Sequence, residues 1–162
     1  ERGDAVLRDW LARNPSDTGA KMLLASNALQ AGHNDDAVAQ FEKMMPTDDP
    51  VILNNLAWLY MQRGDDRALE LARRAYDNAP GNAEIADTLG WILLANGKNR
   101  EAVSILAESA RSLPDNATVQ YHLGIAHLES GSTALAKKAL KRAIDLGGFP
   151  EFDQAREALD TL

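Results

Sequence analysis

The sequence predicts an all-α fold in which pairs of antiparallel helices stack into a solenoid. The first observation is a pattern of small and large residues that occurs twice between residues 50 and 114, with matched positions 33 to 35 residues apart. The second is a series of glycines at spacings of 32, 33 and 34 residues (Gly32, Gly64, Gly97 and Gly131). A fixed period of this size is typical of stacked helical repeats, in which neighbouring copies bury each other's apolar faces. The third is a composition rich in alanine and leucine with only 6% aromatic residues, which suits closely packed helices.

The period divides the chain into six segments. Residues 1–17 form an amphipathic segment with Val6 and Trp10 at helical spacing, ended by Asn14–Pro15. Because later repeats also close on a proline, we expect this segment to be the second helix of a truncated repeat, with an exposed open face. Residues 151–162 are amphipathic as well and are expected to form a capping helix. Between them we expect four repeats of one continuous domain, at residues 18–49, 50–82, 83–116 and 117–150.

The repeat also predicts where helices end and where they cross. A small residue precedes each repeat glycine by seven positions, and an alanine (Ala102 in the third repeat) follows it by four or five. Two helices approach closely where both carry small side chains, so these positions predict the crossing within each pair. The glycine suits a turn with left-handed φ. Asp49, Asn82 and Asn116 are the expected N-caps of the following helices.

Charge and cysteine content exclude several classes of function. The formal net charge is −7 and the isoelectric point about 4.9. These values argue against nucleic acid as a partner, since phosphate binding needs a basic surface. The absence of cysteine excludes disulfides, thiolate catalysis and cysteine zinc sites within the chain. No apolar run reaches the roughly 18 residues of a membrane span, so we expect a soluble fragment that meets a membrane only through an anchor outside it.

No constellation of residues predicts catalysis, a cofactor or a metal site. His122 and His127 are five residues apart, whereas a helical metal pair needs the i, i+4 spacing. They and His33 are therefore interpreted as ordinary surface or groove histidines. Aspartate pairs near helix starts are interpreted as caps; they are Asp35–Asp36, Asp48–Asp49 and Asp65–Asp66. A basic cluster is expected to face outward, either solvated or meeting an acidic partner; it consists of Lys137, Lys138, Lys141 and Arg142.

The repeated residues resemble the tetratricopeptide repeat (TPR), a helix–turn–helix unit of about 34 residues. Residues 50–82 and 83–116 carry the pattern best. The first repeat departs from it with Met44 at a small-residue position, and the last ends in Gly147–Gly148 instead of proline. The resemblance implies a TPR solenoid of antiparallel helix pairs, closed by a C-terminal capping helix, in which the first helices line a concave groove.

A closer resemblance involves longer stretches of sequence. LNNLAWLY, DTLGWILL, YHLGIAHLESG and GGFPEFDQAREAL resemble the C-terminal repeats of the PEP-CTERM system TPR-repeat lipoproteins. This resemblance implies a role in an exosortase-linked system of exopolysaccharide production and protein export. It also implies a periplasmic, outer-membrane lipoprotein whose lipid-bearing cysteine would lie upstream of Glu1.

The first helices would then place one set of side chains from each repeat in the groove. Trp58 and Trp91 occupy the same position in adjacent repeats, 33 residues apart. They are either core residues between first helices or a partly exposed aromatic strip, and an exposed strip is typical of an interaction surface. The expected groove-binding residues are Asn54, Trp58 and Met61, then Asp87, Trp91 and Leu94, then Tyr121 and Ile125.

The predicted function is a non-enzymatic scaffold for protein–protein interaction that binds a protein or peptide segment in this groove. One alternative is a scaffold that binds polysaccharide stacked on the groove tryptophans. Another is a structural spacer in a longer array, which burial of both tryptophans would favour. An enzyme is disfavoured because no acid–base or nucleophile set is present.

Overall fold

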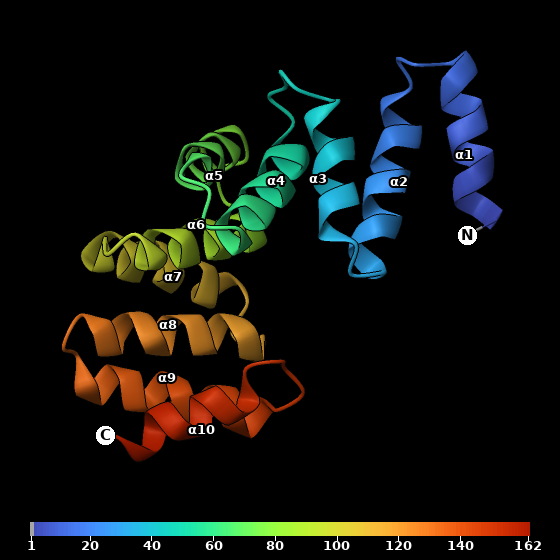
Figure 1. The fold of residues 1–162 in the computed structure, drawn as a ribbon. Coiled ribbons are helices and arrows are strands. Elements are labelled where there is room, and N and C mark those ends of the chain that lie inside the picture. The colour runs from blue at the N-terminus through green and yellow to red at the C-terminus, as the bar shows by residue number, and fades with distance from the viewer. Residues whose placement is uncertain (1) are drawn as a thin grey trace. The chain divides into compact units, whose positions relative to one another are not determined.

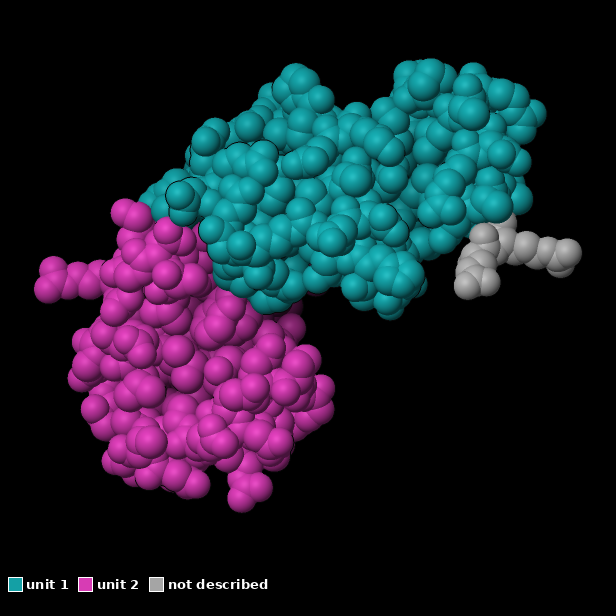
Figure 2. Space-filling model, viewed as in Figure 1, with its two compact units in different colours: residues 1–78 teal, residues 79–162 magenta. Residues whose placement is uncertain are grey.

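The computed structural model describes residues 2–162, and within this range the chain forms ten α-helices and no strand (Figure 1). This confirms the predicted all-α class. None of the described helices combines the length and apolar character needed to cross a membrane. The chain divides into two compact units, one ending at Asn78 and one beginning at Ala79 (Figure 2).

The first unit contains one helix followed by two helix pairs. Consecutive helices pack against each other along the unit. Its largest fully buried side chains are Phe41, Ile52, Leu53, Leu56 and Leu59, which form an apolar interior from several helices. The helices are α1 (Arg2–Arg13), α2 (Thr18–Gln30), α3 (Asn34–Glu42), α4 (Pro50–Gln62) and α5 (Arg67–Asn78).

The second unit contains two helix pairs and a shorter last helix. Within it each helix packs against the next, and the first helices of the two pairs also contact each other. Ile92, Leu93, Leu106 and Leu140 are its largest fully buried side chains. The helices are α6 (Ala83–Ala95), α7 (Asn99–Ser112), α8 (Ala117–Glu129), α9 (Thr133–Leu146) and α10 (Phe152–Asp160).

The predicted helix boundaries are confirmed by backbone geometry. The four repeat glycines have φ between +67° and +77°, a conformation that side chains other than glycine rarely adopt. Side chains of Asp49, Asn82 and Asn116 accept hydrogen bonds from backbone amides in the first turns of α4, α6 and α8. Such a cap contributes about 1 kcal/mol to helix stability.

The crossing within each second-unit pair differs from the prediction of small against small. A Cβ atom built on Gly90 of α6 would lie 2.4 Å from Cγ of Leu106 on α7. On Gly124 of α8 it would lie 2.8 Å from Cγ of Leu140 on α9. Each glycine thus leaves room for a leucine of the partner helix, so a small residue packs against a large one. The alanine that marked the crossing, Ala102, is fully buried.

The N-terminal helix leaves apolar side chains uncovered. Val6 and Trp10 of α1 are exposed, as expected of a face without a covering helix. The indole N–H of Trp10 donates to Oδ2 of Asp17 at 2.8 Å, and the other carboxylate oxygen of Asp17 accepts from the Ala20 amide at the start of α2. These bonds, chiefly the one from Ala20, lower the pKa of Asp17. One carboxylate therefore joins α1 to the cap of α2.

At the other end, α10 closes an aromatic cluster. Tyr121, Leu140, Ala143, Phe149 and Ala155 are buried together. The rings of Tyr121 and Phe149 lie 5.9 Å apart, and Phe149 is 5.9 Å from Phe152 of α10. Leu159 and Leu162 also pack against this cluster. The segment after α9 therefore covers the apolar face that the last helix pair leaves open.

Candidate functional site

The candidate site lies in the second unit, where the first helices α6 and α8 contact each other. Asp87 and Trp91 are four residues apart on α6 and share one face of that helix. Tyr121, His122 and Ile125 lie on α8. The structure brings all five of these side chains into one region of the unit.

A carboxylate–imidazole pair links the two helices. Nδ1–H of His122 donates to both carboxylate oxygens of Asp87, each at 2.9 Å. His122 is only 3% exposed, and the side chain of Asp87 is 15% exposed. The acceptor oxygens hold the proton on Nδ1 and so determine the orientation of the ring. A group as buried as this histidine needs such a partner, because an unpaired buried polar group costs about 1–3 kcal/mol.

His122 in turn supports the indole of Trp91. The two rings are stacked, with centroids 4.1 Å apart and planes 19° from parallel. Tyr121 contacts the same indole at 5.9 Å in a tilted arrangement. Trp91 remains partly exposed while packing against the C-terminal aromatic cluster. It is therefore neither simple core nor a free surface group, but a partly exposed indole whose position is set by its neighbours.

Tyr121 lies deeper than a groove residue. It is 7% exposed and belongs to the C-terminal aromatic cluster, where Phe149 packs against its ring. Burial, with a smaller effect of the Glu151 carboxylate, raises the pKa of its hydroxyl. Tyr121 therefore packs against Trp91 from the buried side and presents little surface of its own to a partner.

The remaining expected groove residues are all partly exposed. Leu94 and Ile125 lie in the second unit, on α6 and α8, and Ile125 packs against the C-terminal aromatic cluster. The first unit carries its own set on α4: Asn54, Trp58 and Met61. Oδ1 of Asn54 is buried and accepts no hydrogen bond from the described residues.

The interpretation of His122 as an ordinary surface or groove histidine is wrong. The ring is buried against Trp91 and bonded to Asp87, 35 residues earlier in the chain. A signal for this contact existed in the repeat. Asp87 stands three residues before Gly90, and His122 stands two residues before the matching Gly124. Adjacent first helices bring such neighbouring repeat positions together, and the search for pairs within one helix missed them.

The Asp87–His122 pair holds an indole in place. A carboxylate–imidazole pair becomes catalytic when it activates a nucleophile, whereas the group that Asp87 and His122 hold in place is an indole. No cluster of three or more metal-ligating side chains occurs in residues 2–162. The arrangement can hold an aromatic surface in one orientation, which suits recognition of an apolar group.

Comparisons with known proteins identify the repeat family and the fold. The family model described as tetratricopeptide repeat matches residues 22–83 and 88–150. A comparison with curated proteins finds no match.

Solved structures share the fold over most of their length. YrrB, described as a TPR protein with an unusual peptide-binding site, is 22% identical over 100% of this chain and 84% of its own, with a TM-score of 0.79. The MamA MSR-1 structure is 26% identical over 89% of this chain and 83% of its own, with a TM-score of 0.74. MamA from Desulfovibrio magneticus RS-1 is 19% identical over 90% of this chain and 83% of its own, with a TM-score of 0.74.

Proposed function

The chain belongs to the tetratricopeptide repeat family, and from this premise we propose that it is a non-enzymatic scaffold that binds a segment of a partner protein on its first helices. TPR proteins are typically interaction scaffolds, and the comparisons indicate no enzyme family. The observation that carries the proposal is Trp91, a partly exposed indole held by the Asp87–His122 pair. Fixing an aromatic side chain before binding reduces the entropy lost on binding, and tryptophan is a preferred anchor of protein interfaces.

The surface around Trp91 defines the ligand chemistry. Leu94 and Ile125 add partly exposed apolar area on the same two helices. Asp87 is engaged by His122 and mostly buried, so it acts by positioning the imidazole rather than as an exposed charge at the rim. The partner segment therefore needs apolar anchors in an extended or helical conformation. Asn54, Trp58 and Met61 would provide a second contact region on α4.

The peptide-binding site named for YrrB supports a protein segment as the ligand class. His122 covers one face of the Trp91 indole at 4.1 Å, so a polysaccharide could stack only on the other face. Burial of both Trp58 and Trp91 would favour the spacer alternative, whereas both are partly exposed.

The biological setting of the scaffold rests on the closer sequence resemblance. We propose that it works in an exosortase-linked exopolysaccharide and protein export system, as the periplasmic part of an outer-membrane lipoprotein. Membrane fractionation of cells that produce the full-length protein, with and without globomycin, tests this setting. Recovery of the protein in the cytoplasmic fraction would contradict it.

The test of binding uses two tryptophan variants. Periplasmic proteins captured on the immobilised chain are identified, and overlapping peptides from them are titrated by fluorescence anisotropy. Trp91→Ala should weaken the tightest peptide more than tenfold, because truncating a hot-spot tryptophan costs about 2 kcal/mol or more. Trp10→Ala is the matched control, since it removes an exposed indole from α1, outside the proposed site.

Two further results separate binding from folding. Circular dichroism should show that Trp91→Ala keeps its helix content. Asp87→Asn retains an acceptor for His122 Nδ1–H and should weaken binding less than Asp87→Leu, which leaves the imidazole unpaired. Equal peptide affinities for the wild type, Trp91→Ala and Trp10→Ala would refute the proposed site.

A further inference from the structure

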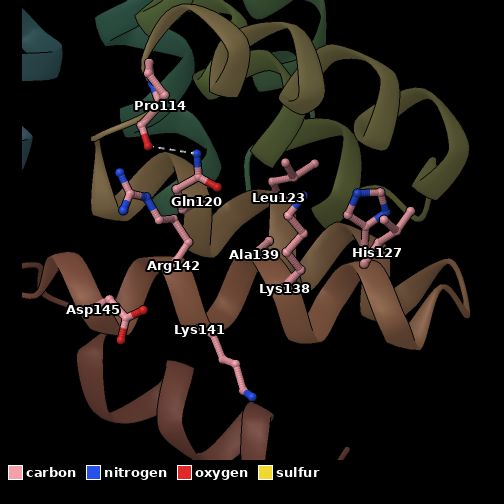
Figure 3. A pocket seen from close by; sticks show the side chains of 10 residues that line it. Pro114, Gln120, Leu123, His127, Lys138, Ala139, Lys141, Arg142 and Asp145 are labelled. Atoms are coloured by element: carbon pink, nitrogen blue, oxygen red, sulfur yellow. Dashed lines mark hydrogen bonds between the residues drawn. The ribbon is translucent and has the colours of Figure 1, made fainter.

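A cavity lies in the same unit as the Trp91 site, on a different face of α8. It is a cavity of about 600 Å³ between α8 and α9, here called the α8/α9 pocket (Figure 3). This volume falls within the roughly 300–1,000 Å³ of typical ligand sites. Leu123 and His127, four residues apart, line it from α8, while Leu135 and Ala139 line it from α9. Trp91 does not line the pocket.

Ala139 enlarges the pocket relative to the matching site of the second repeat. Counted from the buried alanine of each second helix, Ala139 stands where the first three repeats have Gln40, Leu71 and Ile105. Counted from the small residue of each first helix, His127 stands where the second repeat has Tyr60. An alanine in place of a leucine leaves an unfilled volume beside α8. Matching residues of the second repeat, among them Leu56, Tyr60 and Leu71, line a smaller cavity of about 350 Å³, so the hollow is enlarged in the fourth repeat rather than specific to it.

The inner surface of the pocket is apolar. Leu135 is 51% exposed, which makes it one of the large apolar side chains that the described chain leaves in water. Burial lowers the pKa of His127 and so favours the uncharged ring over the charged one. Together with Leu123 and Ala139 these groups can surround one large apolar side chain.

The rim of the pocket is basic. Lys138, Lys141 and Arg142 line it and are exposed, which confirms that the basic cluster faces outward. In Figure 3, Lys138 and Arg142 extend from α9 toward α8 on either side of Ala139. Arg142 is paired with Asp115, and the Asp145 carboxylate also lies in the lining.

The rim is only partly repeated along the chain. Lys43 and Arg74 stand at the position of Arg142 in the first and second repeats, but the position of Lys138 holds Ala39, Glu70 and Ser104 in the three repeats before it. A cation at both positions therefore occurs only in the fourth repeat, in a chain with a net charge of −7.

We propose that the α8/α9 pocket binds an acidic segment of a partner protein, which inserts one aromatic side chain against Leu123, Leu135 and Ala139 and places carboxylates beside Lys138 and Arg142. The combination of one apolar hollow and flanking cations matches an apolar anchor with acidic neighbours. A nucleic acid or an anionic membrane presents an extended array of phosphates, which the net negative charge of the chain repels. This surface is separate from the Trp91 site, so the proposal for one site can be refuted while the proposal for the other stands.

The test uses three synthetic peptides in which Trp, Phe or Leu stands between two pairs of Asp and Glu. Methyl resonances of Leu123, Leu135 and Ala139 should shift on titration with the Trp and Phe peptides, and less with the Leu peptide. A peptide with Gly at the central position should bind at least about tenfold more weakly, because an anchor side chain carries most of the binding energy. Methyl shifts of equal size with all the peptides, including the Gly peptide, would overturn the proposal. An absence of shifts with every peptide would overturn it as well.

Two variants and one control locate the binding. Ala139→Leu supplies the side chain that the second repeat carries here and should abolish the methyl shifts while the melting temperature stays at or above that of the wild type. Lys138→Glu should weaken binding at least about tenfold without filling the pocket. Lys137→Glu changes the same charge on an exposed neighbour outside the lining and should bind like the wild type.

The Lys137→Glu control also distinguishes specific binding in the pocket from general electrostatic attraction of the acidic peptides. Equal losses for Lys137→Glu and Lys138→Glu, or unchanged binding by Ala139→Leu, would refute the pocket as the site. Vesicles containing phosphatidylglycerol and a single-stranded oligonucleotide serve as competing anions. If either binds more tightly than the Trp peptide and loses binding with Lys138→Glu, a different class of partner uses this surface and the proposal is wrong.

Discussion

A single methyl group added at Gly90 tests the close crossing of α6 and α7. The new Cβ would lie 2.4 Å from Cγ and 2.7 Å from Cδ2 of Leu106, far inside the roughly 3.5–4.0 Å of a favourable carbon contact. Leu106 is fully buried, and its Cγ is a branch point rather than a mobile end. The clash therefore requires either the leucine or one helix to move.

Two opposing effects determine the size of the change. Alanine favours a helix over glycine by about 1 kcal/mol, whereas overpacking a core costs about 1–3 kcal/mol. Gly90→Ala should therefore lower the free energy of unfolding by up to about 2 kcal/mol. Leu106→Ala alone should lower it by about 2–5 kcal/mol. In the Leu106→Ala background the clash is gone, so the same Gly90→Ala change should raise stability.

Urea denaturation of the four proteins gives the coupling between the two positions. We expect an interaction energy of about 1–3 kcal/mol, equal to the overpacking that Leu106→Ala removes. Gly3→Ala is the matched control, because a Cβ at that helical glycine would meet nothing within 4 Å. If the effects of Gly90→Ala and Leu106→Ala add to within about 0.5 kcal/mol, the two residues are not in the close contact described.

Three other predictions concern packing, titration and local opening. Ala102→Leu should cost about 1–3 kcal/mol because this alanine is fully buried, and an unchanged thermal melt would contradict its tight packing. Burial and the hydrogen bond to Glu42 raise the pKa of Tyr60 to about 12, above its unfolded value near 10. The stabilisation from the neutral hydroxyl is thus complete below pH 10 and is lost as the pH rises toward 12. Tyr60→Phe should remove one late-titrating phenol from the ultraviolet absorbance titration; an unchanged curve would contradict this. Hydrogen exchange should be fastest in α1 and slowest in α4 to α7, since α1 leaves apolar side chains uncovered, and slowest exchange in α1 would reverse this expectation.

Regular features of the repeat could be predicted because each depends on local chemistry. Gly64 and Gly97 mark turns through their backbone freedom, and Asn82 marks a helix start through its own amide oxygen. The partner of a small residue is not a local property. Gly90 could have faced Ala102 or Leu106, which lie one helical turn apart on the same helix, and only the packed structure distinguishes them.

The site was harder to predict for a similar reason. Trp91 was found from its repetition, but its partner His122 lies one repeat and one residue beyond Asp87. That offset follows from how adjacent helices pack, not from periodicity. Tyr121 occupies the repeat position of Asp87 and yet is buried, because Phe149 packs against its ring from the end of the fourth repeat. Equivalent positions therefore have different environments at the end of an array.

The Asp87–His122 bond has a consequence for how such a chain can be rearranged by recombination. If the third and fourth repeats exchanged places, the two matching positions would hold Tyr121 and Thr88, and neither could replace the bond. The carboxylate and the imidazole would each be left without the other inside the protein, which disfavours the exchanged order. Although each repeat is a similar unit of sequence, these two form a block that can be duplicated or transferred together but not shuffled.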